Sequence, residues 1–198
     1  MTSCVEETVS GVNSQIGRIK ELAGRFPDQE LITSMTLFNH RITRVLDRIP
    51  PAELREIAFS DYRPDGNTAL LDAIGKTVRH LQDTIGDEVA RDEASVVVVI
   101  FTDGYENASR EYTHARVSSL ISELELTGKW SFSYIGATLD AVEIAIRLNI
   151  RKSNSMRYDV NDSHIAHQKV SRNMMSYLSE KEEGRIKKDF LEEEADEK

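Results

Sequence analysis

Apolar residues recur along the chain with two periods, and these periods predict the order of helices and strands. Residues 5–23 place apolar side chains at steps of three and four, which is typical of one face of a helix. Residues 71–85 repeat this spacing. Shorter helices are expected over residues 115–126 and 139–149, and a last one over 162–178.

Short segments rich in branched and aromatic residues predict strands between these helices. Residues 95–102 (SVVVVIFT) form an apolar run without alternation, which indicates a parallel strand covered on both faces and the best candidate for a central strand. Residues 31–38 and 130–135 are also expected to be strands, with a weak one near 157–160. Residues 40–49 are more charged and follow a turn too short for a helical crossover, so they should pair antiparallel at an edge.

This order predicts the α/β fold class, with a Rossmann-like, open and mostly parallel sheet, one antiparallel edge strand, and helices on both faces. One domain is expected over residues 1–178. Residues 179–198 form a charged tail, in which 180–198 hold nine acidic and five basic side chains. Such a composition predicts a solvated helix extension or a frayed terminus.

The charge of the chain excludes some partners. Among 198 residues, 25 are basic and 34 acidic, which gives a net charge of −9. This charge argues against nonspecific binding of nucleic acid or of an anionic membrane surface. The single cysteine, Cys4, cannot form an internal disulfide, so a cytoplasmic location is expected. The longest strongly apolar run is far shorter than the ~20 residues that span a bilayer.

Candidate chemistry lies where the predicted strands end, because ligands of open α/β sheets bind beyond the carboxyl ends of the strands. Asp103 follows the apolar strand 95–102. Its carboxylate is either a ligand for a hard cation such as Mg²⁺ or a turn-forming or capping group. Thr68 lies just before the helix predicted over 71–85. Its hydroxyl is either a helix N-cap or a metal ligand.

Together, these two segments resemble the von Willebrand factor type A (VWA) domain, and most of all its bacterial and phage single-domain members. Residues 66–70 (GNTAL) match the family's threonine loop, residues 96–104 (VVVVIFTDG) match its aspartate strand, and the order of elements matches over about 1–178. In that family, a metal ion-dependent adhesion site combines these loops with a D-x-S-x-S motif after the first strand. The resemblance implies that Thr68 coordinates Mg²⁺ or Mn²⁺ directly and that Asp103 holds the ion through water.

Four neighbouring residues are further candidates under this resemblance. Asp72, one turn into the helix, would support the site from behind the ligands; a solvated or capping carboxylate is the alternative. Gly104, Glu106 and Asn107 follow the aspartate and would line the rim where a partner meets the metal. A solvated loop is the alternative interpretation for this segment.

The chain departs from the family pattern at its beginning, because the D-x-S-x-S motif and the strand before it are absent, and Met1 stands where the family often has a methionine after the motif. Without those ligands, Mg²⁺ or Mn²⁺ should bind weakly or not at all. The missing strand would leave a gap of roughly 10 Å between the strands over 31–38 and 95–102. Three explanations stay open: a start upstream of Met1, direct pairing of the two neighbours, or a strand from another chain.

The resemblance implies a non-enzymatic protein-binding module, in which an acidic residue of a protein partner fills an open position on the ion. One alternative is a Mg²⁺-dependent phosphoryl-transfer or hydrolytic enzyme that uses Asp103, although the sequence has no D-x-D pattern there and no Gly-rich phosphate loop. Another is a VWA scaffold that has lost its metal. His164 and His167 are expected to be a surface pair rather than a zinc site. The oligomeric state is left open.

Overall fold

The elements of the fold follow the predicted order. A computed structural model describes residues 2–64 and 66–191, with side chains for 5–64, 66–160 and 162–191. The helices are α1 (Thr2–Arg25), α2 (Leu70–Ala90), α3 (His114–Leu126), α4 (Ala141–Arg147) and α5 (Ser163–Glu182). The strands are β1 (Thr33–Phe38), β2 (Ile42–Ile49), β3 (Val96–Thr102), β4 (Trp130–Gly136) and β5 (Ser155–Arg157). Short 3₁₀ turns, η1 to η3, lie at Pro51–Glu53, Lys152–Asn154 and Val160–Asp162. The α/β class is therefore confirmed.

Hydrogen bonding divides the described strands into two sheets instead of the single open sheet that was predicted. Strands β3, β4 and β5 are parallel and adjacent in that order, whereas β1 and β2 form a separate antiparallel pair. The break lies between β1 and β3, where the sequence predicted a missing strand. Direct pairing of these two strands, one of the three explanations, is not found.

The central strand of the parallel sheet is β4, so the prediction that β3 is central was wrong. Every residue of β4 is buried. The apolar run of β3 is explained by the burial of both faces of the strand. Val96 and Ile100 pack in one hydrophobic cluster, and Val97 and Val99 pack against another. Burial of both faces does not determine how many strands are hydrogen-bonded to β3. In the described sheet, β3 is hydrogen-bonded only to β4 and is therefore an edge strand.

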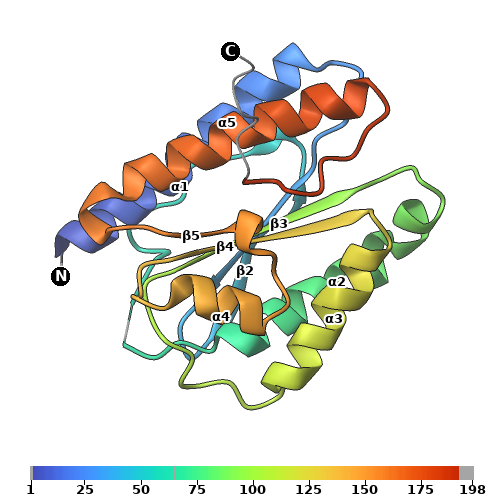
Figure 1. Cartoon of the computed structure of the whole chain (residues 1–198). Helices are drawn as coiled ribbons and strands as arrows, with labels where there is room; N and C mark the ends of the chain where they lie inside the picture. Colours follow the sequence, from blue (N-terminus) through green and yellow to red (C-terminus); the bar gives the residue numbers. More distant parts are fainter. Residues whose placement is uncertain (1, 65, 192–198) are drawn as a thin grey trace, which may run out of the picture.

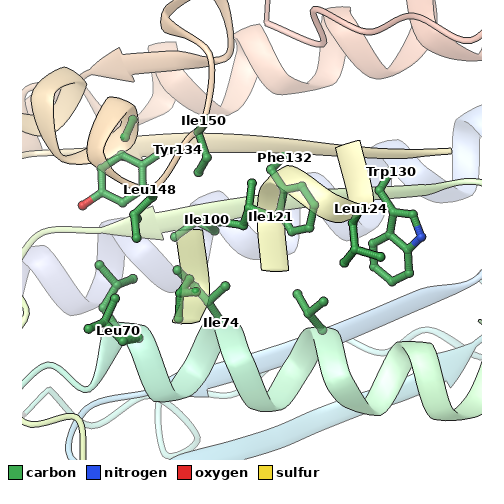
Figure 2. Close-up of a cluster of buried hydrophobic side chains, with 14 of the residues drawn as sticks. Leu70, Ile74, Ile100, Ile121, Leu124, Trp130, Phe132, Tyr134, Leu148 and Ile150 are labelled. Atoms are coloured by element: carbon green, nitrogen blue, oxygen red, sulfur yellow. The ribbon is translucent and has the colours of Figure 1, made fainter. Parts of the chain in front are cut away.

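Two hydrophobic clusters lie on opposite faces of the parallel sheet. The first joins alternate residues of β3 and β4 to α2, α3 and α4, and Figure 2 shows this row of side chains between the strands and the helices. The second joins the other face to α1 and α5, which run side by side in Figure 1. The parallel sheet is thus the middle of three layers.

Side chains, rather than a backbone ladder, attach the β1–β2 hairpin to α2. The hydroxyl of Thr77 donates to that of Thr36 at 3.0 Å, and His80 Nε2 lies 2.9 Å from Asp47 Oδ1. Farther along α2, Glu88 lies 3.7 Å from the guanidinium of Arg48 on β2. These polar contacts are partly exposed, so the hairpin is attached less firmly than a strand within a sheet.

The chain after α5 folds back onto the second cluster, which corrects the prediction of a solvated or frayed tail for the part up to residue 191. Phe190 and Leu191 are fully buried there. Lys187 is buried as well, and its ammonium donates to the Ser176 hydroxyl at 2.9 Å. The sequence did not predict this packing, because the segment is mostly charged and only two large apolar residues, Phe190 and Leu191, are buried in it. Residues 192–198 lie outside the described residues.

His167 is buried, so the predicted surface pair with the exposed His164 was wrong. The His167 ring stacks on Phe101 of β3, with 4.5 Å between the ring centroids. A Cβ at Gly11 of α1 would overlap the His167 ring, so only glycine lets the two helices approach this closely. Burial lowers the pKa of His167 to about 4, which keeps the imidazole neutral at physiological pH.

Candidate functional site

Thr68 and the segment after Asp103 meet at the carboxyl edge of β3. Helix α2 begins at Leu70 with Ala69 as its N-cap, so the N-cap interpretation of Thr68 was wrong. Asp103 is exposed in the bend that follows β3. A Cβ at Gly104 would lie 2.7 Å from Thr68 Oγ1, which means that the backbone after Asp103 passes directly over the Thr68 hydroxyl. The two predicted ligand residues therefore belong to one surface.

The loop after β3 is hydrogen-bonded to the start of α2 through Glu106 and Asn107. The Thr68 backbone N–H donates to Asn107 Oδ1 at 2.8 Å, and the Asn107 N–H donates back to the Thr68 carbonyl at 3.0 Å. Glu106 Oε2 accepts from the Leu71 N–H at 2.9 Å. Glu106 thus supplies an acceptor for an N–H group in the first turn of α2, which has no partner within the helix, and Asn107 holds the residue before the N-cap. The solvated-loop interpretation does not hold for Glu106, which is half-buried, whereas Asn107 is exposed.

Ser109 completes this capping arrangement, a role that no pattern in the sequence indicates. Its hydroxyl accepts from the Asp72 N–H at 3.0 Å and donates to Glu106 Oε2 at 2.7 Å. Glu106 Oε1 in turn accepts from the backbone N–H groups of Ala108 and Ser109, at 3.0 and 2.8 Å. A loop serine is common in any sequence, so its distant partner could be found only in the folded chain.

Asp72, in the first turn of α2, also holds the loop after β3 through hydrogen bonds. Its side chain is 5% exposed, and its Oδ1 accepts from the N–H groups of Glu111 and Tyr112, at 2.9 and 2.7 Å. Oδ2 accepts from the Arg110 N–H at 2.9 Å. Burial acts to raise the pKa of Asp72, but these three N–H donors outweigh it and hold the pKa below its usual value. The alternative of a solvated or capping carboxylate was therefore wrong.

Packing beside Asp72 reinforces this attachment. A Cβ at Gly75 would overlap the Tyr112 ring, so the ring lies directly on the backbone of α2. The guanidinium carbon of Arg116 lies 4.5 Å from the centroid of the same ring. The loop after Asp103 is thus held at both of its ends, and Thr68 keeps a fixed position relative to it.

The oxygen donors at this edge match a hard cation by type but are too few to enclose one. Asp103 carries a carboxylate and Thr68 a hydroxyl. The carboxylates of Asp72 and Glu106 accept backbone N–H groups of the loop and of α2. Within residues 2–64 and 66–191, no three His, Cys, Asp or Glu side chains gather as a metal-binding group. Because Mg²⁺ demands six oxygen ligands, the described residues would hold it only with several waters or with ligands from elsewhere.

Comparison of the chain with protein-family models, with curated proteins and with solved structures found no match. Among the described helices, none has the length and apolar character that crossing a membrane requires.

Proposed function

We propose that the chain is a non-enzymatic, cytoplasmic protein-binding module of the VWA type, in which Thr68 and Asp103 supply part of a metal ion-dependent adhesion site. The observation that carries this proposal is the contact between Thr68 and the backbone at Gly104, directly after Asp103. It brings Thr68 and Asp103, which are 35 positions apart in the sequence, to one edge of the sheet. The order of helices and strands supports the same family, as does the break between β1 and β3, where the family has a further strand.

Thr68 and Asp103 would hold Mg²⁺ or Mn²⁺, and the ion would supply a Lewis-acidic position for a carboxylate of a protein partner. This role fits the charge of −9, because a cation can join two acidic surfaces that otherwise repel each other. The hydrogen bonds of Asp72, Glu106 and Asn107 support the proposal by fixing the two loops together. Such preorganisation is what a metal site requires of the residues around its ligands.

Calorimetric titration with Mn²⁺ tests the proposal on the chain and on a chimaera in which an apolar strand ending in D-x-S-x-S precedes Met1. The chimaera should bind Mn²⁺ at least about tenfold more tightly than the chain, because it adds one carboxylate and two hydroxyls. Asp103→Ala should abolish the gain. Asp83→Ala, an exposed carboxylate on α2, is the matched control and should leave it unchanged.

Two other results would contradict the proposal. A chimaera that binds Mn²⁺ no better than the chain, while its circular dichroism shows it folded, would favour a metal-free scaffold. Tight Mn²⁺ binding by the unextended chain, together with hydrolysis of p-nitrophenyl phosphate that Asp103→Ala removes, would favour the enzyme. Where the chimaera does bind, addition of a glutamate-containing peptide should produce a further heat only in the presence of the ion.

A further inference from the structure

A cavity of about 690 Å³ lies between strand β2 and the segment over residues 52–61. Its apolar lining consists of Val45, Leu46 and Ile49 of β2, together with Leu54 and Ile57 of the segment. The two residues of the segment are buried, whereas the three residues of β2 are half-buried, so apolar side chains are accessible here. The volume is in the range of pockets that hold ligands.

Two irregularities in β2 turn its apolar side chains toward this cavity. The register of β2 against β1 shifts on either side of the Met35–Leu46 pair. Arg48, beside the first shift, has a φ of 54°, which is uncommon for a residue other than glycine. Residues three apart in a regular strand point to opposite faces, but the extra residue of a bulge lets Leu46 and Ile49 line the same cavity.

The two walls of the cavity belong to different parts of the fold. Asn13 of α1 holds the segment: its Nδ2 donates to the Ile57 carbonyl at 3.1 Å, and the Ile57 N–H donates to Asn13 Oδ1 at 2.9 Å. The opposite wall is the β1–β2 hairpin, whose polar contacts with α2 are partly exposed. A ligand in the cavity would therefore contact both the hairpin and a segment fixed to α1.

The charged residues of the cavity are mainly acidic. Glu53, Glu56 and Asp61 line it with one cation, Arg55. Glu53 and Glu56 are exposed, while Asp61 Oδ2 accepts the Ala58 N–H at 2.8 Å. An apolar cavity with an acidic rim is complementary to an apolar side chain that has positive charges on either side of it.

We propose that this cavity binds an extended segment of a partner protein, in which apolar side chains alternate with lysine or arginine. An apolar side chain would enter between β2 and residues 52–61, and its basic neighbours would pair with Glu53 and Glu56. Phe59, which is 58% exposed, follows in the same segment and offers an aromatic face to a cation. Among the described strands β2 pairs only with β1, so its other edge is open to the backbone of an extended segment.

Charge decides between this occupant and two others. A second copy of the chain would bring a net charge of −9 to an acidic rim, and an anionic membrane surface would also face these carboxylates. A basic and apolar segment is attracted by the same rim. The cavity shares no lining residue with the proposed metal site, so this proposal does not rest on the VWA assignment.

The first experiment titrates an acetylated and amidated Lys-Leu-Lys-Leu-Lys peptide into ¹⁵N-labelled protein and follows the amide signals of residues 45–57. Saturable shifts are expected there. The corresponding Glu-Leu-Glu-Leu-Glu peptide should not bind, and Lys-Ser-Lys-Ser-Lys should bind at least about tenfold more weakly, because it buries no apolar side chain. Absence of saturable shifts with the first peptide, or equal binding of the serine peptide, would overturn the proposal.

A pair of double variants separates the acidic rim from the net charge of the protein. Glu53→Gln with Glu56→Gln should weaken binding of Lys-Leu-Lys-Leu-Lys by about threefold to tenfold, because two exposed ion pairs are lost. Asp83→Asn with Glu143→Gln removes the same charge from exposed positions on α2 and α4 and should bind like the wild type. Equal weakening by both double variants would overturn the proposal.

Ala52→Trp tests the cavity itself. Ala52 lines the cavity but is exposed, so a larger side chain fills the space from its rim without entering the core. The peptide-free variant should melt like the wild type and bind Lys-Leu-Lys-Leu-Lys at least about tenfold more weakly. Unchanged affinity would overturn the proposal. Self-association of the wild type that Ala52→Trp abolishes would also overturn it, because a second copy would then be the occupant.

Hydrogen exchange tests whether the peptide contacts both walls. Peptide at 100 times its dissociation constant should slow the exchange of β2 amides and of the Ile57 amide by up to about 100-fold, while β4 amides should not change. Protection of only one wall would overturn the proposal. Binding of n-hexylammonium as tight as that of the peptide would do so as well, because a small amine would then suffice.

Discussion

Replacement of Asp72 by asparagine removes the charge that holds three backbone N–H groups of the loop after β3. Asparagine keeps one oxygen for the N–H groups of Glu111 and Tyr112 but turns an NH₂ group toward the N–H of Arg110. One hydrogen bond to a charged acceptor is lost, and the partly buried N–H of Arg110 is left facing another donor. The expected loss in the free energy of unfolding is about 3 kcal/mol at neutral pH.

Urea unfolding measures this loss through the fluorescence of Trp130, the single tryptophan, which is buried against the first cluster. The midpoint should fall without a change in slope, because the folded structure stays compact. Amide hydrogen exchange should become faster at residues 110–112, which lose their acceptor. Asp83→Asn, an exposed carboxylate on the same helix, should stay within about 0.5 kcal/mol of the wild type.

The effect of Asp72 depends on pH in a definite direction. Its folded pKa lies below the unfolded value of 3.8, so the ionised carboxylate contributes its full stability above pH 3.8. That contribution disappears as the pH falls through the folded pKa, and the wild type should then approach the asparagine variant in stability. Equal stability of the two proteins at neutral pH, or a difference that stays constant in acid, would refute this account of the loop.

Three other perturbations address packing. Because burial lowers the pKa of His167 to about 4, wild-type stability should fall by up to about 3 kcal/mol as the pH drops from 6.5 to 4, and urea midpoints of His167→Phe should lack this slope. Gly11→Ala places a Cβ into the His167 ring and should cost about 1–3 kcal/mol in thermal unfolding, whereas Gly17→Ala on the same helix, with open space around it, should cost nothing. Phe190→Ala should cost about 3–5 kcal/mol by urea unfolding, and an equal loss in the exposed Lys188→Ala would show that the chain after α5 acts through charge instead.

Periodicity was sufficient for the order of elements, because it reports which faces of a helix or strand are covered. The helix over 71–85 became α2 and the weak strand near 157–160 became β5, with shifts of a few residues at their ends. The division of the strands into two sheets could not be predicted from periodicity. A hydrogen-bonded neighbour depends on backbone geometry between distant segments, which the side chains of β1 and β3 do not encode.

The candidate site was predicted in part for the same reason. The rule that ligands bind at carboxyl edges pointed to Asp103, and the resemblance to the VWA family led us to expect Thr68 beside it. The roles of Asp72 and Ser109 stayed hidden, because each bonds to backbone N–H groups or side chains across a separation of more than 35 positions. The burial of His167 was missed as well, because the neighbours of Gly11 on its helix face are polar and give no sign of close packing there: Glu7, Thr8, Ser14 and Gln15.

The attachment of the β1–β2 hairpin to α2 has a consequence for the cooperativity of unfolding. A two-stranded ribbon is marginally stable by itself, and exposed or half-exposed polar contacts such as Thr36 to Thr77 add only about 1 kcal/mol each. We therefore expect the hairpin to open before the parallel sheet does (Figure 1), although this opening uncovers Phe38 of β1, which packs on the first cluster. Its amide protons should exchange through this partial opening, at rates far above those of β4, which makes the hairpin the part of the protein that samples an unpaired state most often under native conditions.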